Sequence, residues 1–311
     1  MTLLIYPVIS FLLSVLTIPI FGKLAYRYGI VDKPNGELKP HEKITPYLGG
    51  IAIYLAVILV TPFEIISKAS LTLLMLTGLI DDVKNLSPKT RLIIEFIVAS
   101  LLTYKYIGIS WLSLAYIFVS VVLINAVNMM DGMDGVCAGV SIVSAIGLSF
   151  SVSSKFDAIL LLSLIGALFG YFIYNFPPAR IFMGDSGSYL IGGILSVGLL
   201  SAFRHGPSQI SYVISSFIFT SLFFFDLSSG VLRRILNHRP PFGGDREHVY
   251  DKIYERFKDK RKTLYVMLLI QIIAFLFGYY TKSNNFLSIV AILIVIVLYS
   301  ILGKILEILR Y

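Results

Sequence analysis

The sequence has few charged residues and only one cysteine, and these shortages exclude several classes of protein. Asp, Glu, Lys and Arg make up 14% of the 311 residues, whereas soluble proteins contain about 25%. Because Cys137 stands alone, the chain forms no internal disulfide and no multi-cysteine metal site, and redox chemistry is not expected. The first apolar run lacks a basic leader and a small-residue cleavage site, so we expect a retained helix there and not a signal peptide.

The sequence also lacks a nucleic-acid-binding motif, although its net charge is +8. No folded basic domain and no base-stacking motif accompany that charge, and we therefore expect no nucleic-acid partner. Apolar residues are abundant: 57% of the chain is hydrophobic and its mean hydropathy is +0.84, whereas soluble domains are about 45–50% apolar. The composition predicts that a bilayer is the solvent and that residues 1–311 form a single transmembrane domain.

Apolar runs of helical length recur along the whole chain. They cover residues 2–22, 46–63, 69–80, 91–107, 110–130, 136–153, 157–176, 186–203, 209–231, 263–280 and 286–308. Runs of this length and hydropathy are typical of membrane-spanning helices. The expected fold class is therefore an all-α polytopic integral membrane protein with about 11 transmembrane helices.

The distribution of basic residues predicts the orientation of the spans. With the N-terminus outside, alternation places the C-terminus and residues 23–45, 81–90, 125–136, 175–187 and 232–262 inside. Of the 26 Lys and Arg residues, only Lys68, Lys105, Lys155, Arg204 and Lys282 then lie outside. By the positive-inside rule the inside is the cytoplasm. Because Gly, Asn, Asp and Pro concentrate in the inside loops, we expect any active site on the cytoplasmic face of the cell (inner) membrane.

Two adjacent carboxylates, Asp81 and Asp82, end the third apolar run. Carboxylates this close to a low-dielectric boundary repel each other unless a cation lies between them. They are candidates for a divalent-metal site or a general base. The alternative is a solvated pair of charges, neutralised by the nearby Lys84, Lys89 and Arg91.

A dense polar block occupies residues 125–135, at the end of the fifth run. Asn125, Asn128 and Asp131 recur every third residue, which keeps them near one face of a helix. Two glycines in the block permit the backbone to approach a ligand closely. A helix cap would explain one of these polar residues but not all of them, and such groups are costly at the end of a span unless they bind something.

A third polar stretch, residues 175–188, precedes the eighth run. Asp185 and Ser186 could cap the helix that follows, and its N-terminal dipole would also favour a phosphate group. Capping does not explain the preceding Phe182, an aromatic residue that could stack on a base. Asp185 is therefore a candidate both for a cap and for a ligand contact.

The inside loop 232–262 is long and basic. Its chemistry-bearing residues are Arg233, Arg234, His238, Arg239, Asp245, Arg246, Glu247 and His248. Arginine binds phosphate in a bidentate way, and a histidine can donate a proton to a transferring phosphate. The alternative is that a polybasic loop attracts anionic lipids without any chemistry.

Carboxylates, amides and basic residues on one membrane face favour metal-assisted phosphoryl transfer. Mg²⁺ prefers carboxylate and phosphate oxygens and would polarise the attacked phosphorus, with Mn²⁺ as a substitute. The alternative from another class is a transporter or flippase of an anionic lipid-linked solute. Transporters usually carry polar residues near the midplane of broken helices, whereas the spans between these clusters are nearly free of charge.

Several short stretches also occur in a fixed order along the chain. They cover residues 31–35, 45–50, 78–82, 125–135, 182–188 and 245–248. In content and order they resemble the polyprenyl-phosphate N-acetylhexosamine-1-phosphate transferases, the family of WecA, TagO and MraY. The first stretch is more similar to the WecA/TagO branch, which implies UDP-GlcNAc as the donor. The last stretch departs from that branch, because no His-rich run accompanies His248.

The resemblance implies roles by position. The implied catalytic residues are Asp81, Asp82, Asp131 and His248, and the implied Mg²⁺ ligands are Asp185 and Asp82. The implied substrate-binding residues are Lys43, Lys89, Asn125, Asn128, Asp134, Asn175, Phe182 and Arg246, with uracil at Asn175 and Phe182. The implied partners are a UDP-sugar, a polyprenyl phosphate in the membrane and a second copy of the chain. Direct attack of the lipid phosphate on the β-phosphorus, with UMP leaving, and a covalent aspartyl-phosphate route both remain open.

Overall fold

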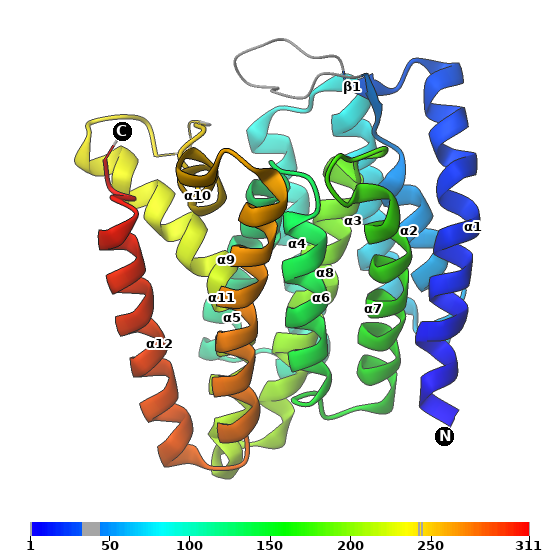
Figure 1. Ribbon diagram of the computed structural model, residues 1–311. Helices are drawn as coiled ribbons and strands as arrows, with labels where there is room; N and C mark the ends of the chain where they lie inside the picture. Colours follow the sequence, from blue (N-terminus) through cyan, green and yellow to red (C-terminus); the bar gives the residue numbers. More distant parts are fainter. Residues whose placement is uncertain (1, 33–43, 242, 244, 311) are drawn as a thin grey trace.

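The computed structural model describes residues 2–32, 44–241, 243 and 245–310, which are helical almost throughout (Figure 1). Lys43 and the 33–35 part of the first family-like stretch lie outside the described residues. The helices are α1 (Ile5–Tyr28), α2 (Gly49–Ile58), α3 (Ile65–Lys84), α4 (Pro88–Ile107), α5 (Trp111–Met130), α6 (Val136–Ser149), α7 (Lys155–Asn175), α8 (Gly184–Ala202), α9 (Ile210–Leu236), α10 (Val249–Phe257), α11 (Lys260–Thr281) and α12 (Asn285–Ile305). A two-residue strand β1 (Val31–Asp32) pairs antiparallel with β2 (Thr45–Pro46).

The structure confirms a polytopic α-helical membrane fold. Seven helices within the described ranges are long and apolar enough to cross a bilayer: α1, α5, α7, α8, α9, α11 and α12. Each of the expected apolar runs falls on a helix, but α2 and α6 have only 10 and 14 residues, against about 20 for a full span. The exact number of spans therefore stays a prediction.

Helix boundaries follow local capping chemistry. The Glu64 carboxylate accepts hydrogen bonds from the first amides of α3, and Ser87 accepts from Thr90 N at the start of α4. Gly29 ends α1 with a φ of 71°, a conformation that costs glycine little. These signals fix where each helix starts and stops, and so fix the loops that carry the polar motifs.

The α8 helix forms the centre of the bundle. It packs against α3 and α5, and 94% of its most apolar 18-residue stretch is buried. Small residues allow this close approach: a Cβ on Gly192 would lie 2.6 Å from Ile124 Cα of α5, and one on Gly193 would lie 2.5 Å from Leu74 Cδ1 of α3. The position of every group at the N-terminal end of α8 therefore depends on α3 and α5.

The two termini lie at opposite ends of the helical layer (Figure 1). Strand β1, helix α10 and the C-terminus share one end, and the N-terminus lies at the other. We call the end with β1 and α10 the loop end. Which end faces the cytoplasm stays a prediction.

Gly78 gives a direct test of the α3–α8 packing. A Cβ at this position would lie 2.3 Å from the carbonyl carbon of Asp185, so we expect Gly78→Ala to lower stability by about 1–3 kcal/mol. Gly22→Ala is the matched control, because its Cβ would meet nothing closer than 3.9 Å and alanine is the better helix former. Thermal unfolding in detergent measures both variants. Equal melting temperatures for the two would contradict the packing described here.

Candidate active site

The first turn of α8 is capped by a carboxylate from another helix. Asp82, near the end of α3, accepts hydrogen bonds from the backbone N–H of Asp185 (2.8 Å) and of Ser186 (3.2 Å). Gly184 makes this contact feasible, because its φ is 66° and a Cβ there would lie 2.5 Å from an Asp82 oxygen. Asp82 thus fixes the backbone that presents the Asp185 side chain.

The Asp185 carboxylate is oriented by α5. Asn128 Nδ2 donates to Asp185 Oδ1 (2.6 Å) and to Ser188 Oγ (2.9 Å). Asp185 also lies close enough to Asp81 for a direct side-chain interaction. Two carboxyl groups that interact directly require a shared proton or an intervening cation.

The Asp81 carboxylate forms an ion pair with an arginine of the same chain. Its Oδ2 lies 2.8 Å from Arg91 Nη1, its Oδ1 accepts from Leu86 N (2.6 Å), and Arg91 also donates to Tyr189 Oη (3.3 Å). The neutralising cation considered from the sequence is therefore Arg91. Lys89 is exposed at the start of α4 and forms no hydrogen bond or ion pair with a described residue, so its substrate role stays a prediction.

The Asp131 carboxylate has both oxygens available for a ligand. It follows the last residue of α5 and is half-buried, and its side chain has no hydrogen-bond partner among residues 2–32, 44–241, 243 and 245–310. Burial, followed by the neighbouring Asp185 and Asp82 carboxylates, raises the pKa of Asp131 well above its usual value. A cation at this point would relieve that cost.

Asp134 and Asn175 hold the loops of the site together. Asp134 Oδ2 accepts from Ala179 N (3.2 Å) and from Lys260 Nζ (3.1 Å). The Asn175 amide accepts from Gly135 N (2.8 Å) and donates to the Ile181 carbonyl (2.9 Å). Both side chains are buried. The structure therefore gives them a scaffold role, and their nucleotide contact stays a prediction.

Phe182 and Tyr47 place two aromatic rings side by side at the loop end. The ring centroids are 6.3 Å apart, and Phe182 N donates to the Pro46 carbonyl (2.8 Å). Burial and the neighbouring Asp32 carboxylate raise the pKa of Tyr47. Phe182 is half-buried, which leaves part of its ring available for stacking on a base. Sequence reasoning missed Tyr47, although it lies within the 45–50 stretch.

Glu95 is a second residue that sequence reasoning missed. It is 1% exposed within α4, and Asn125 Nδ2 donates to its carboxylate and to the Val121 carbonyl (2.9 Å). A lone acidic residue in an apolar run was the available signal, because ionisable groups inside a membrane are usually functional. Asn125 is thus occupied by an internal partner, and its substrate contact stays a prediction.

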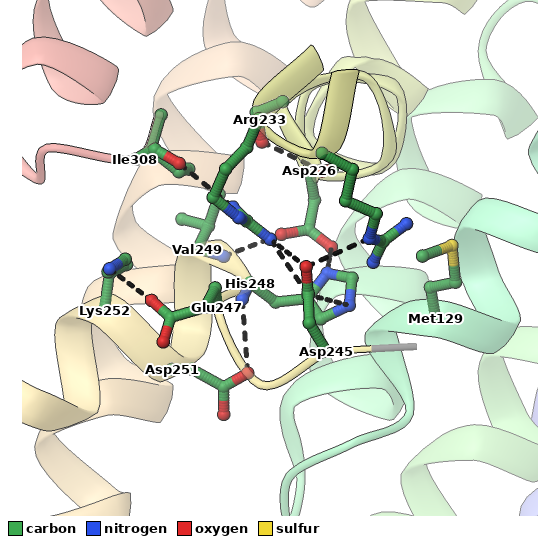
Figure 2. Close-up of polar contacts among 12 residues, drawn as sticks. Met129, Asp226, Arg233, Asp245, Glu247, His248, Val249, Asp251, Lys252 and Ile308 are labelled. Atoms are coloured by element: carbon green, nitrogen blue, oxygen red, sulfur yellow. Dashed lines mark hydrogen bonds and ion pairs between the residues drawn. The ribbon is translucent and has the colours of Figure 1, made fainter. Parts of the chain in front are cut away.

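The two arginines at the end of α9 bind a carboxylate of the same chain. Arg233 Nη2 lies 2.9 Å from both Asp245 oxygens, and Arg234 Nε lies 2.9 Å from one of them. Burial opposes ionisation of Asp245, but the hydrogen bonds from Arg234 and Arg233 lower its pKa to about 2. Figure 2 shows this buried network. Arg233 and Arg234 are therefore structural, and they do not form the open phosphate-binding surface that the loop suggested.

His248 is oriented by a buried aspartate of α9. Its Nδ1 lies 2.8 Å from Asp226 Oδ2, while its Nε2 lies 4.0 Å from Asp245 Oδ1 (Figure 2). Burial lowers the pKa of His248, but the Asp226 carboxylate outweighs it and the net shift is upward. Asp226 is fully buried and also accepts from Val249 N (2.7 Å). Sequence reasoning missed it, although it is a lone charge in an apolar span.

The basic loop and α10 dock on the polar block 125–135, at the end of α5. Arg246 Nη1 donates to the Gly132 carbonyl (3.1 Å), and the Tyr250 hydroxyl donates to the Met129 carbonyl (3.1 Å). The structure thus brings the Asp81/Asp82 pair, the 125–135 block and the start of α8 into one site, with the loop of His248 against its rim.

Comparisons with known proteins point to one family. A family model described as glycosyl transferase family 4 matches residues 65–202. A probable undecaprenyl-phosphate N-acetylglucosaminyl 1-phosphate transferase of Bacillus subtilis is 31% identical over 96% of this chain and 91% of its own. Relatives named undecaprenyl-phosphate alpha-N-acetylglucosaminyl 1-phosphate transferase are 26% identical in Thermotoga maritima (94% of this chain, 95% of the relative) and 29% identical in Escherichia coli (89% and 83%).

The chain belongs to the polyprenyl-phosphate N-acetylhexosamine-1-phosphate transferase family. The resemblance read from the short stretches is thereby confirmed. The matched family region contains Asp81, Asp82, Asp131 and Asp185 but ends before Asp226 and His248. The carboxylate part of the site thus lies inside the region that the family model describes.

The residues of this family member fit a magnesium ion only with help from substrate. Within the described ranges, no three His, Cys, Asp or Glu side chains form a ready metal-binding group. Mg²⁺ usually needs only one or two carboxylates and completes its shell with water and substrate phosphates. Asp185, with Asp131 or Asp82 beside it, satisfies that requirement.

Proposed function

We propose that this protein transfers GlcNAc-1-phosphate from UDP-GlcNAc to a polyprenyl phosphate, giving polyprenyl-diphospho-GlcNAc and UMP. The printed names of its relatives support this substrate pair. The observation that carries the proposal is the convergence of Asp81, Asp82, Asp131 and Asp185 at the N-terminus of α8. Such a group suits a metal-bound diphosphate, whereas a transporter would need polar groups along a path through the bundle.

The chemistry assigned to the chain follows from these contacts. Asp185, together with Asp82 or Asp131, would hold Mg²⁺, which would neutralise the diphosphate and polarise the β-phosphorus. A lipid phosphate oxygen forms a bond to the β-phosphorus, the bond from the β-phosphorus to the bridging oxygen breaks, and UMP leaves with that oxygen. Asn128 keeps the Asp185 carboxylate in place, and Phe182 with Tyr47 offers a stacking surface for uracil. A covalent aspartyl intermediate remains the alternative route.

The proposed orientation places the loop end in the cytoplasm, where nucleotide sugars are made available. The N-terminus would then lie outside and the C-terminus inside, as the distribution of Lys and Arg predicts. About 11 spans, Mn²⁺ as a substitute metal and a homodimer stay predictions.

Two assays on the purified protein test the proposed function. With UDP-GlcNAc, undecaprenyl phosphate and Mg²⁺, the protein should release UMP, and chelating the metal should stop the release. Failure to release UMP from every UDP-hexosamine tried would contradict the proposal. Uptake of an anionic lipid-linked solute into vesicles without nucleotide cleavage would instead support a transporter.

Asn128→Ala tests the support of the metal ligand. The change removes the donor to Asp185 Oδ1 and should weaken apparent Mg²⁺ affinity or activity by about 10–100-fold. Ser188→Ala is the matched control, because it removes the other acceptor of Asn128 and leaves the Asn128–Asp185 hydrogen bond in place. UMP release over a Mg²⁺ titration measures both. An unchanged Mg²⁺ midpoint in Asn128→Ala would show that Asp185 needs no such support.

A further inference from the structure

A cavity of about 650 Å³ lies between α9 and α12, toward the loop end of the bundle. None of the candidate active-site residues lines it. Its walls come from residues 225–232 of α9, from residues 299–304 of α12 and from the turn formed by residues 306–310. The cavity therefore lies toward the loop end, which also carries α10 and the C-terminus (Figure 1).

One part of the cavity is apolar and is lined by two stacked aromatic rings. The rings of Phe225 and Tyr299 stack with centroids 4.7 Å apart and planes within 9°, and the Tyr299 hydroxyl is hydrogen-bonded to Ser221 (2.9 Å). Gly303 allows close packing beside these rings, because a Cβ there would come within 3.2 Å of Ile308 Cγ2 and 3.5 Å of Phe225 Cζ. This surface suits an acyl chain.

The other part of the cavity is polar with an excess positive charge. Lys304 is exposed and its ammonium group has no ion-pair or hydrogen-bond partner among the described residues. The same holds for the hydroxyl of Ser228. Arg310 and Glu307 neutralise each other at 3.2 Å. Lys304 thus supplies one uncompensated positive charge beside a hydroxyl donor.

We propose that this cavity binds an anionic phospholipid, with its phosphate at Lys304 and Ser228 and an acyl chain across Phe225 and Tyr299. A phosphodiester carries one negative charge, which a single lysine balances. A phosphate monoester such as the lipid substrate carries about −1.5 to −2 at neutral pH and would be left partly unpaired here. The proposed lipid is therefore distinct from the acceptor of the transfer reaction.

The cavity wall is connected to the network around His248. The Ile308 carbonyl accepts from Arg233 Nη1 (2.9 Å), and Arg233 in turn binds Asp245 (Figure 2). Asn237 donates to the neighbouring Leu309 carbonyl (3.3 Å). A lipid in the cavity packs against the turn that these bonds hold, so its binding should raise the melting temperature as well.

Binding is tested by titrating the purified full-length protein with phosphatidylglycerol or phosphatidylcholine and counting bound lipids by native mass spectrometry. The wild type should retain phosphatidylglycerol at one saturable site and prefer it over phosphatidylcholine. Lys304→Ala should weaken that binding by about fivefold, the usual worth of one lysine at a lipid surface. Lys23→Ala is the matched control, since it removes an exposed lysine on α1 at the opposite edge of the bundle.

A second variant tests the cavity without changing charge. Ser300 lines it and donates only to the Ile296 carbonyl of its own helix (2.8 Å), so Ser300→Trp should fill the space and abolish the saturable site. Inorganic phosphate and undecaprenyl phosphate are added as competitors, and neither should displace phosphatidylglycerol at equal concentration. Equal retention of the two phospholipids, unchanged binding in both variants, or displacement by undecaprenyl phosphate would each overturn the proposal. None of these readouts depends on UMP release, so the proposed function is tested separately.

Discussion

Asp185→Asn should abolish nearly all UMP release while leaving the fold intact. The side chain keeps its shape and its contact with Asn128. The hydrogen bond from the backbone N–H of residue 185 to Asp82 is also unchanged. What disappears is the negative charge on the group that we propose as the main Mg²⁺ ligand, and a neutral amide oxygen is a much poorer partner for a hard divalent cation.

The measurement is turnover over a Mg²⁺ titration, together with the melting temperature. Glu255→Gln makes the same carboxylate-to-amide change at an exposed position of α10 and should behave as the wild type. Near-normal turnover of Asp185→Asn at low Mg²⁺ would show that another group holds the metal.

Asp81→Asn and Asp82→Asn should each lower turnover by about 10²–10⁴-fold if the residue is a general base for the lipid phosphate. A phosphate monoester has a second pKa of about 6 and is mostly dianionic at neutral pH. A base is therefore needed chiefly below neutrality, and a true base variant should recover as the pH rises. A defect that is equal at every pH and is rescued by more Mg²⁺ would instead identify a metal-holding residue.

The structure separates the two variants further. Asp82 accepts from two backbone amides, and an asparagine offers only one oxygen, so Asp82→Asn leaves one amide of α8 without its acceptor. A buried donor left unpaired costs about 1–3 kcal/mol, so this variant should also melt earlier. Asp81→Asn also loses one of two acceptors, those of Leu86 N and Arg91 Nη1. Leu86 is only half-buried and the Arg91 side chain is 30% exposed, so water can replace the lost acceptor and this variant should melt closer to the wild type. UDP-GlcNAc binding measured alongside distinguishes lost catalysis from lost structure.

Sequence reasoning located the helices well because hydropathy is a local property. It failed where two helices end early: the runs at 46–63 and 136–153 go on past the ends of α2 at Ile58 and of α6 at Ser149. Hydropathy alone does not register such an end, since the average over each run stays apolar although Pro62, Ser151 and Ser153 follow the helices.

The sequence predicts which residue types gather at the candidate site, but it does not predict their partners. Asp82 and Asp185 are 103 positions apart, and only the packing of α3 on α8 reveals that one caps the helix carrying the other. Arg233 and Arg234 are residue types that often bind phosphate, yet Asp245, eleven or twelve positions later, binds both. Whether a charge is already paired is a three-dimensional property that a sequence does not display.

The contact between Gly78 and Asp185 has a consequence for any survey of inactive variants. The two residues touch, yet they should fail for different reasons: a side chain at Gly78 separates two helices and reduces the amount of folded protein, whereas an amide at Asp185 leaves the amount unchanged. A genetic selection that scores only growth would report loss of function at both positions and would not separate them. Measuring protein abundance in the same cells would separate them, because abundance should fall for variants of a residue that assembles the bundle and stay unchanged for variants of a residue that acts on substrate.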